Sequence, residues 1–264
     1  MKYLVVVSDL HINSTVGLCD KTVMLDDGGS YTPPRSQKWL YDNWLDFWTF
    51  VDSLSGDSII TVLNGDMVDI NKHAGHQLIT PNVSVVLEHT ISLLSLVKEI
   101  SDRIYVVRGT AAHTGSSSQI EESLSRELQA VPSANSWSHW TLPIQVDGVL
   151  FDIAHHGKIG STTWNRTAPL HTLAASITFN AVKNNVKIPD IVIRSHNHTH
   201  ADTHDNLPVR VISTPAWQLS TEYSYRLGIV EMADIGGLIF ACEDGHYELI
   251  KKLYKPQAKE VIVE

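Results

Sequence analysis

The sequence predicts an α/β fold in which two β-sheets face each other as a sandwich and helices flank them. Short apolar runs rich in β-branched residues recur along the chain. In the first half they alternate with helical patterns, which is typical of a parallel sheet with helical crossovers, whereas from Asp190 onward the strands follow one another with short connections. Because the 264 residues contain no linker-like segment or internal repeat and 43% are hydrophobic, we expect one domain spanning residues 1–264.

Each expected strand is a run bounded by polar residues or glycine, and the six runs cover residues 3–7, 59–63, 104–107, 149–154, 191–194 and 209–213. Helices are expected over 38–54 and 83–100, where apolar residues fall on one stripe, after Ser118 with Glu121 at capping-box spacing, and over about 170–186. Trp39, Trp44 and Trp48 on the first helix are interpreted as core residues, not as a platform for stacking bases.

Composition limits the partners of this chain. The formal net charge of −9 disfavours long nucleic acid unless bound cations reverse the local field. Cys19 and Cys242 stand far apart without metal-binding spacing, which predicts free thiols in a reducing compartment. No apolar run reaches the length of a signal-peptide core or a membrane span, so we expect a cytoplasmic protein with no membrane partner; the oligomeric state is left undetermined.

Residues 13–35 form a long connection between the first strand and the first helix, and contain Asp26-Asp27-Gly28-Gly29 and Pro33-Pro34. A long loop at the end of a strand is usually a specificity element, so we expect an active-site loop here, with disorder as the alternative.

Polar residues follow nearly every expected strand. The strand ends lead into Asp9 and His11, Asn64-Gly65-Asp66, the segment 109–113, His155-His156, and the segment 195–200. Residues two apart on extended backbone share a face, so Asp9 and His11 can bind one cation together. His198 and His200 have the same spacing and are expected to share a face in the same way. Each motif alone has an ordinary alternative, a capped turn or a solvent-exposed strand face. Mixed carboxylate and imidazole ligands favour a transition ion over Ca²⁺ or Mg²⁺, and Asp66 could bridge two such ions.

The order of these motifs resembles the calcineurin-like metallophosphoesterase superfamily, whose signature runs D-x-H, G-D, G-N-H, H, G-H-x-H. The resemblance spans residues 8–200. It implies a four-layer αββα fold and a dinuclear metal centre that hydrolyses phosphate esters by attack of a metal-bridging hydroxide. Segment 113–128 also resembles a variant bacterial and phage-type subgroup.

Carried onto this chain, the resemblance gives the first metal Asp9, His11 and His200, with Asp66 bridging. It gives the second metal Asp66, His198 and His155, with His156 as the alternative to His155. The expected cofactors are two divalent ions, with Mn²⁺ preferred and Fe, Zn or Ni as alternatives.

Two positions depart from the family pattern. Asn197 replaces a glycine, and Gly109-Thr110-Ala111-Ala112-His113 replaces Gly-Asn-His, so the asparagine that completes the second metal site is missing. Three alternatives follow: His113 is still the catalytic histidine and general acid, it has become a ligand, or the second metal is held weakly.

Several neighbouring residues are candidates for supporting roles. Asn64, Asp69 and Thr110 could contact the metals or hydrogen-bond their ligands. Arg108 and Arg194 could bind phosphate, although surface ion pairs are their ordinary alternative. His73 and His76 lie on the loop after Asp66 and could reach a substrate.

The expected function is hydrolysis of a phosphodiester or nucleotide-type substrate, with Asp66 and His113 central to catalysis. The alternatives are a phosphomonoesterase or phosphoprotein phosphatase, a metal-dependent binding protein without turnover, and a histidine-rich domain without metal.

Overall fold

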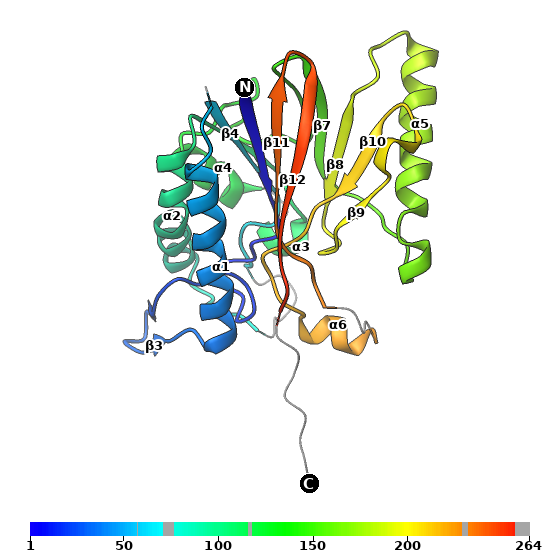
Figure 1. Ribbon diagram of the computed structural model, residues 1–264. Coiled ribbons are helices and arrows are strands. Elements are labelled where there is room, and N and C mark those ends of the chain that lie inside the picture. Colours follow the sequence, from blue (N-terminus) through cyan, green and yellow to red (C-terminus); the bar gives the residue numbers. More distant parts are fainter. Residues whose placement is uncertain (57, 71–76, 116–117, 229–231, 257–264) are drawn as a thin grey trace.

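The computed structural model describes residues 1–56, 58–70, 77–115, 118–228 and 232–256. Its main feature is a pair of five-stranded sheets that face each other (Figure 1). The first sheet has the order β12-β11-β1-β4-β5, and the second has the order β6-β7-β8-β10-β9. A two-stranded hairpin, β2 (Val23–Met24) and β3 (Ser30–Tyr31), stands apart from both.

In the first sheet three strands run parallel and a hairpin completes it. The parallel strands are β1 (Lys2–Val7), β4 (Ser58–Asn64) and β5 (Arg103–Val107). β11 (Ile235–Glu243) pairs antiparallel with β1 and with β12 (His246–Tyr254). β11 and β12 are missing from the strands expected from the sequence, which end at residue 213.

The second sheet is built on the same plan. β7 (Val149–His156), β8 (Ile191–Ser195) and β10 (Arg210–Ser213) are parallel, with antiparallel edges at β6 (Leu142–Val146) and β9 (Ala201–Asp202). Pairing of β7 with β8 is irregular between Ile153 and His156, because Ile153 pairs with Ile193 and His156 pairs with Ser195. β7 therefore has one more residue than its partner here, which defines a β-bulge.

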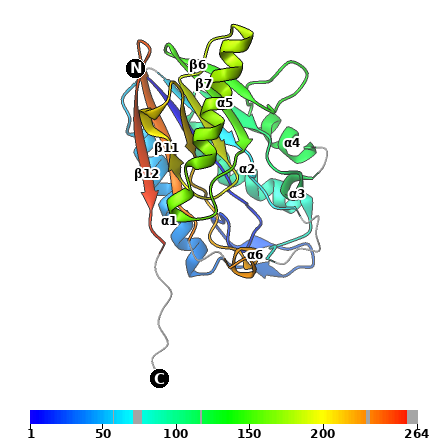
Figure 2. The same ribbon diagram turned by 90° about the vertical axis from the view of Figure 1, so that its right-hand side faces the viewer.

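Helices cover the outer faces of both sheets (Figures 1 and 2). α1 (Arg35–Asp52), α2 (Val83–Ile100) and α4 (Gln119–Glu127) lie on the first sheet, and α5 (Ala168–Asn184) lies on the second. Short helices α3 (Ala111–Thr114) and α6 (Glu222–Arg226), and 3-10 turns at Thr163–Asn165 and His204–Asn206, connect these elements. The predicted αββα sandwich is confirmed.

Alternation along the strands divides the core into layers. Leu4 and Val6 of β1 pack between the two sheets, whereas Tyr3, Val5 and Val7 face the helices. On α1 the Trp44 and Trp48 side chains are fully buried, so their expected place in the core is confirmed. Because both sheets are apolar on their inner faces, they hold the ends of their strands in fixed relative positions.

Segment 13–35 is described throughout, with the β2–β3 hairpin near its middle. Its first part packs inward: Leu18 is buried, and the Gln37 Nε2 group donates hydrogen bonds to the backbone oxygens of Ser14 and Gly17. That it acts as an active-site loop stays a prediction. Over the described part of the chain, the helices are too short or too polar to cross a membrane.

The layer between the sheets should dominate the free energy of unfolding. Phe151 of β7 is fully buried and its ring packs against Phe240 of β11, with the centroids 5.2 Å apart. We expect Phe151→Ala to lower the free energy of unfolding by about 3–5 kcal/mol, because it removes buried apolar area and leaves a cavity. Phe179→Ala, where the ring is 68% exposed on α5, is the matched control and should change it by less than about 0.5 kcal/mol. Urea denaturation followed by circular dichroism measures both, and equal effects would contradict the assignment of this layer as the main core.

Candidate metal centre

Five strand ends deliver polar residues to one edge of the sandwich. β1, β4 and β5 are parallel in one sheet, β7 and β8 in the other, and their carboxyl ends converge near α3 (Figure 1). The residues at or just after these ends include Asp9, Asp66 and His155, each with at most 1% of its surface exposed. An open α/β architecture places its ligands at such an edge.

Five of the candidate ligand residues have left-handed backbone conformations, which set the directions of their side chains. The φ angles are 54° at Asp9, 44° at His11, 50° at Asp66, 76° at His196 and 52° at His198. The extended backbone expected from the Asp-x-His and His-x-His spacing is therefore wrong: β1 ends at Val7 and β8 at Ser195, and single left-handed residues turn the chain instead. Such residues are uncommon outside glycine and concentrate at functional sites.

Asp9, His11 and His198 form the first group of potential ligands. The His198 Nε2 atom lies 3.3 Å from Asp9 Oδ1 and 3.2 Å from His11 Nε2, and His11 Nε2 lies 3.9 Å from Asp9 Oδ1. Burial opposes ionisation of Asp9, but the positive charges of His198 and His155 and the proximity of the His11 ring outweigh it and lower the pKa of this carboxyl. Asp9 is therefore an anion.

Asp66, His155 and His196 form the second group. Asp66 Oδ2 lies 2.9 Å from His155 Nε2 and 3.8 Å from His196 Nδ1. Asp9 Oδ1 lies 4.0 Å from His155 Nε2, so this oxygen is close to nitrogens of both groups. Burial opposes ionisation of Asp66 too, but interactions with the His155 and His196 rings hold its pKa well below the usual value.

The structure does not group the last two histidines as the sequence suggested. His198, assigned to the second metal, lies with the first group, and His200 belongs to none of the three ligand groups found among the described residues. The His200 Nδ1 atom lies 3.0 Å from the Ser213 backbone oxygen, and its backbone N–H donates to Asp234. His196 was missed, although it stands two residues before His198 and directly after a strand.

A third group, formed by His11, Asp69 and His113, connects the first ligand group to His113. Asp69 Oδ1 lies 2.9 Å from His11 Nδ1 and 2.6 Å from His113 Nδ1. Burial opposes ionisation, but the charge of His11 and hydrogen bonds to both histidines lower the pKa of Asp69. With both Nδ1–H groups donating to one oxygen, the Nε2 atom of each ring is available for other partners.

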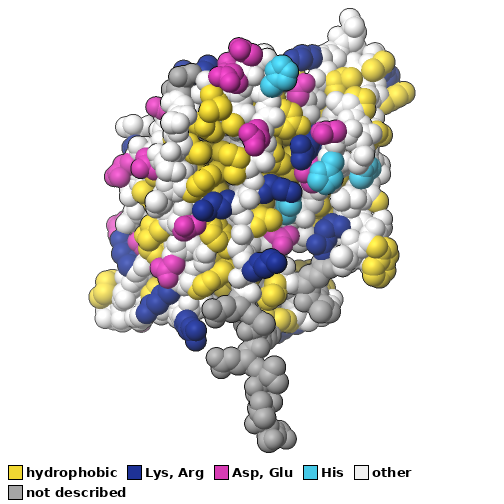
Figure 3. Space-filling view, in the orientation of Figure 1, with side chains coloured by type: hydrophobic (Ala, Val, Ile, Leu, Met, Phe, Trp, Pro, Cys, Tyr) yellow, Lys and Arg dark blue, Asp and Glu magenta, His cyan; other side chains and the backbone are white. Residues whose placement is uncertain are grey.

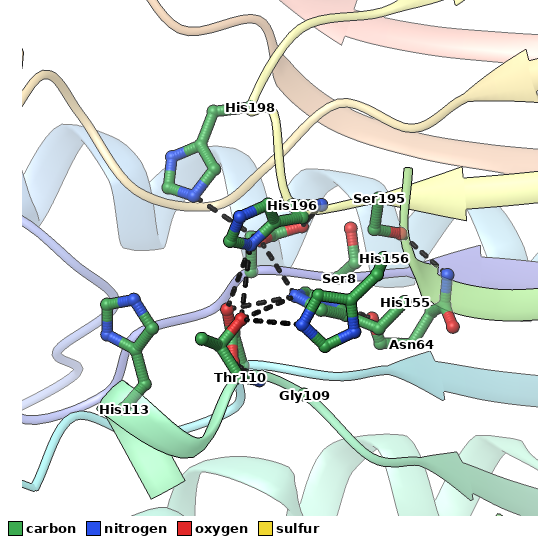
Figure 4. A network of polar contacts seen from close by, with 12 residues as sticks. Ser8, Asn64, Gly109, Thr110, His113, His155, His156, Ser195, His196 and His198 are labelled. Carbon is green, nitrogen blue, oxygen red and sulfur yellow. Dashed lines mark hydrogen bonds and ion pairs between the residues drawn. The ribbon is translucent and has the colours of Figure 1, made fainter. Parts of the chain in front are cut away.

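The turn after β5 approaches the second group closely. A Cβ atom at Gly109 would lie 2.2 Å from the Asp66 nitrogen, and one at Gly65 would lie 2.4 Å from His155 Nδ1, so both positions require glycine. The Thr110 N–H donates to Asp66 Oδ1 over 2.6 Å. Figure 4 shows the Thr110 hydroxyl among the rings of His155, His156 and His196.

Glu121 accepts a hydrogen bond from this turn, a role that the sequence did not suggest. Instead of closing a capping box on Ser118, its Oε1 atom accepts the Gly109 N–H over 2.6 Å. Its Oε2 atom is buried without a hydrogen-bond partner. Burial raises the pKa of Glu121 to about 7, and the hydrogen bond from Gly109 only partly offsets this.

Asn64 fixes His155 and connects the two sheets. Its backbone oxygen accepts a hydrogen bond from His155 Nδ1 over 2.7 Å, and its side chain donates to Ser195 Oγ at the end of β8 over 2.6 Å. Contact of Asn64 with a candidate ligand, one of the roles considered for it, is thus present in the structure.

The two arginines are held by residues other than the candidate ligands. Arg108 donates to Glu122 and to the Ser136 and Ser138 hydroxyls, and its guanidinium stacks on Trp140. Arg194 donates to Asp152. Both therefore serve as ion-pair partners, which was the ordinary alternative to phosphate binding. His73 and His76 lie outside the described residues.

The donor set fits divalent cations. Because His155 Nδ1–H donates to Asn64, the neutral ring presents a lone pair to Asp66 Oδ2 at 2.9 Å, and two lone pairs repel each other unless a positive charge lies between them. With the histidine rings neutral, Asp9 Oδ1 and Asp66 Oδ2 are buried without a hydrogen-bond donor. Without a cation, burial opposes protonation of His155, but the charge of Asp9 and the hydrogen bond to Asp66 favour it. The pKa of His155 therefore rises to about 9. A bound cation can replace that proton.

No protein-family model and no curated protein matches this chain. Its structure is similar to a dimetal phosphatase from Danio rerio, at 10% identity over 94% of this chain and 95% of that one, with a TM-score of 0.47. It is also similar to Vps29 from Chaetomium thermophilum (10% identity, 96% and 95% covered, TM-score 0.47) and to a metallophosphoesterase from Sphaerobacter thermophilus (11%, 96% and 89%, 0.40). Such low values leave the function to be decided by the residues themselves.

Glu121 gives a pH dependence that can be measured. A carboxyl whose pKa is raised from 4.5 to about 7 on folding stabilises the fold in its protonated form, and that stability is lost as the pH rises through about 7. We expect the free energy of unfolding of metal-stripped Glu121→Gln, relative to wild type, to increase by about 3 kcal/mol from pH 4.5 to pH 8. Denaturant titrations at several pH values measure this difference. Glu99→Gln on the exposed side of α2 is the control. If the free energy of unfolding of Glu121→Gln relative to wild type changes with pH no more than that of the control, the assignment is wrong.

Proposed function

We propose that this protein is a dinuclear metal-dependent phosphoesterase. The observation that carries the proposal is the pairing of two buried ligand groups, one around Asp9 and one around Asp66, at adjacent strand ends. Asp9 Oδ1 lies within 4.0 Å of nitrogens from both groups, so the two cations would be neighbours.

The ligands are assigned from the groups that the fold brings together. Asp9, His11 and His198 would hold the first cation, and Asp66, His155 and His196 the second, with the bridging role of Asp66 retained as part of the proposal. The Ser195-His196-Asn197-His198 segment thereby takes the role given to residues 197–200 by the resemblance. Mn²⁺ is the preferred ion, with Fe, Zn and Ni as alternatives, because the set mixes carboxylate with imidazole.

Two neighbouring divalent cations polarise the phosphoryl oxygens and supply an activated water when they are bound. The chain itself orients the other reacting groups. His113 is 34% exposed on its side chain, and its Nδ1 atom is held by Asp69, which leaves Nε2 to donate a proton to the leaving oxygen. His113 is therefore assigned as the general acid and Asp69 as the residue that positions it.

A phosphodiester or nucleotide-type substrate is favoured over a phosphomonoester or phosphoprotein. Arg108 and Arg194 are engaged with Glu122 and Asp152, so neither supplies a fixed positive charge for a dianionic monoester. On the face shown in Figure 3, basic side chains are interspersed with acidic ones. The formal net charge of −9 fits a small substrate better than a long polyanion.

The first prediction of this proposal concerns Asp66. Metal-stripped protein resupplied with Mn²⁺ should hydrolyse bis-p-nitrophenyl phosphate faster than p-nitrophenyl phosphate, and Asp66→Ala should lose the activity together with at least one bound ion. Asp52→Ala, at an exposed position at the end of α1, is the control. Wild-type protein that binds two ions but hydrolyses neither ester would favour the second candidate, a metal-dependent binding protein, whose only support is Thr110 in place of asparagine.

A second prediction separates a general acid from a ligand at position 113. His113→Gln should lower kcat by about 10²–10⁴-fold and leave the metal content at the wild-type value, because the proton donor is lost while the ligand groups remain. Metal analysis by mass spectrometry and steady-state kinetics measure the two quantities. A matching loss of bound metal would instead assign His113 as a ligand.

A further inference from the structure

His156 lies beside the second ligand group because of the bulge in β7. Regular alternation would point His155 and His156 to opposite faces of the sheet, as expected from the sequence. The extra residue between Ile153 and His156 breaks that alternation. His155 and His156 therefore both reach the Thr110 hydroxyl, with their Nε2 atoms 3.4 Å from Thr110 Oγ1.

The three imidazoles around Thr110 are evenly spaced. Ring centroids are 5.1 Å apart for His155 and His156, 5.3 Å for His155 and His196, and 5.3 Å for His156 and His196. Three imidazoles on one tetrahedral ion, with metal–nitrogen bonds of about 2.0–2.1 Å, would have centroids roughly 5 Å apart. The spacing of the rings matches such a set.

The nitrogens of the three rings point at one hydroxyl. Thr110 Oγ1 is 3.1 Å from His196 Nδ1 and 3.4 Å from the Nε2 atoms of His155 and His156 (Figure 4). The ligand atoms of Asp66, His155 and His196 lie within 4.8 Å of one another and His156 is outside that group, so ligation by His156 requires its ring to move toward the other two.

We propose that His156 is a third imidazole ligand of the second cation, which would then be held by His155, His156, His196 and Asp66. This inference rests on the proposed metal centre and deepens it. The Thr110 hydroxyl occupies the corner between the rings and orients them. Three imidazoles and one carboxylate make the second site richer in nitrogen than the first, which favours Zn²⁺, Co²⁺ or Ni²⁺ there over Mg²⁺.

The test is a titration of metal-free protein with Co²⁺, followed by calorimetry and by the visible absorption of the bound ion. Wild type should bind two ions. His156→Ala should bind the first ion normally and the second at least about 10-fold more weakly, with a changed absorption spectrum, because one nitrogen ligand is lost. His246→Ala, at an exposed histidine in the β11–β12 hairpin, is the matched control and should behave as wild type.

The outcomes separate the inference from the function on which it rests. If wild type binds two ions and His156→Ala binds both with unchanged affinity and spectrum, the ligand role of His156 is wrong while the dinuclear centre stands. If wild type binds fewer than two ions, both proposals are wrong. Circular dichroism of His156→Ala shows whether the fold is retained, and Thr110→Val, which keeps the imidazoles, should weaken the second ion less than His156→Ala does.

Discussion

The burial of two carboxylates at neighbouring strand ends is the constraint on which the rest of the site depends. Asp9 and Asp66 are both fully buried, and an unpaired buried anion costs several kcal/mol. The surrounding histidines supply positive charge only if they carry extra protons, and adjacent protonated rings repel one another. A divalent cation removes this conflict, because neutral imidazoles can then face the carboxylates through it. The electrostatics thus favour the same arrangement as the ligand geometry.

The backbone conformation at the site is maintained by the packing of the two sheets. Five of the candidate ligands adopt left-handed conformations, and each such residue costs on the order of 1 kcal/mol or more. Their sum is comparable with the whole stability of a typical domain. The strands that precede them carry buried apolar residues at or next to their last position, such as Val7 in β1 and Leu63 in β4, which fix where each turn begins. A rigid core is therefore a requirement of this site.

The sequence predicted the layers of the fold and most of the candidate ligands, because strand ends can be recognised from apolar runs that stop at polar residues. The expected ligand was His200 and not His196, since residue spacing says nothing about the left-handed conformation of His196 that turns the chain after Ser195. The sequence predicted that Glu121 caps its own helix, whereas in the structure its carboxylate accepts a hydrogen bond from the Gly109 N–H in the turn after β5. It assigned His156 to the opposite face because a bulge depends on how β7 pairs with β8. These misses share one cause: each depends on contacts between segments distant in the sequence.

Asp69 connects the two halves of the proposed chemistry. One of its oxygens accepts hydrogen bonds from both His11 and His113, so the two rings compete for the same negative charge. A positive charge at His11 Nε2 polarises that ring and strengthens its Nδ1–H bond to Asp69. Less negative charge on the shared oxygen then remains for the His113 Nδ1–H group. Loading the first ligand group would in this way change the contact that positions the proposed proton donor, without contact between His113 and the cation.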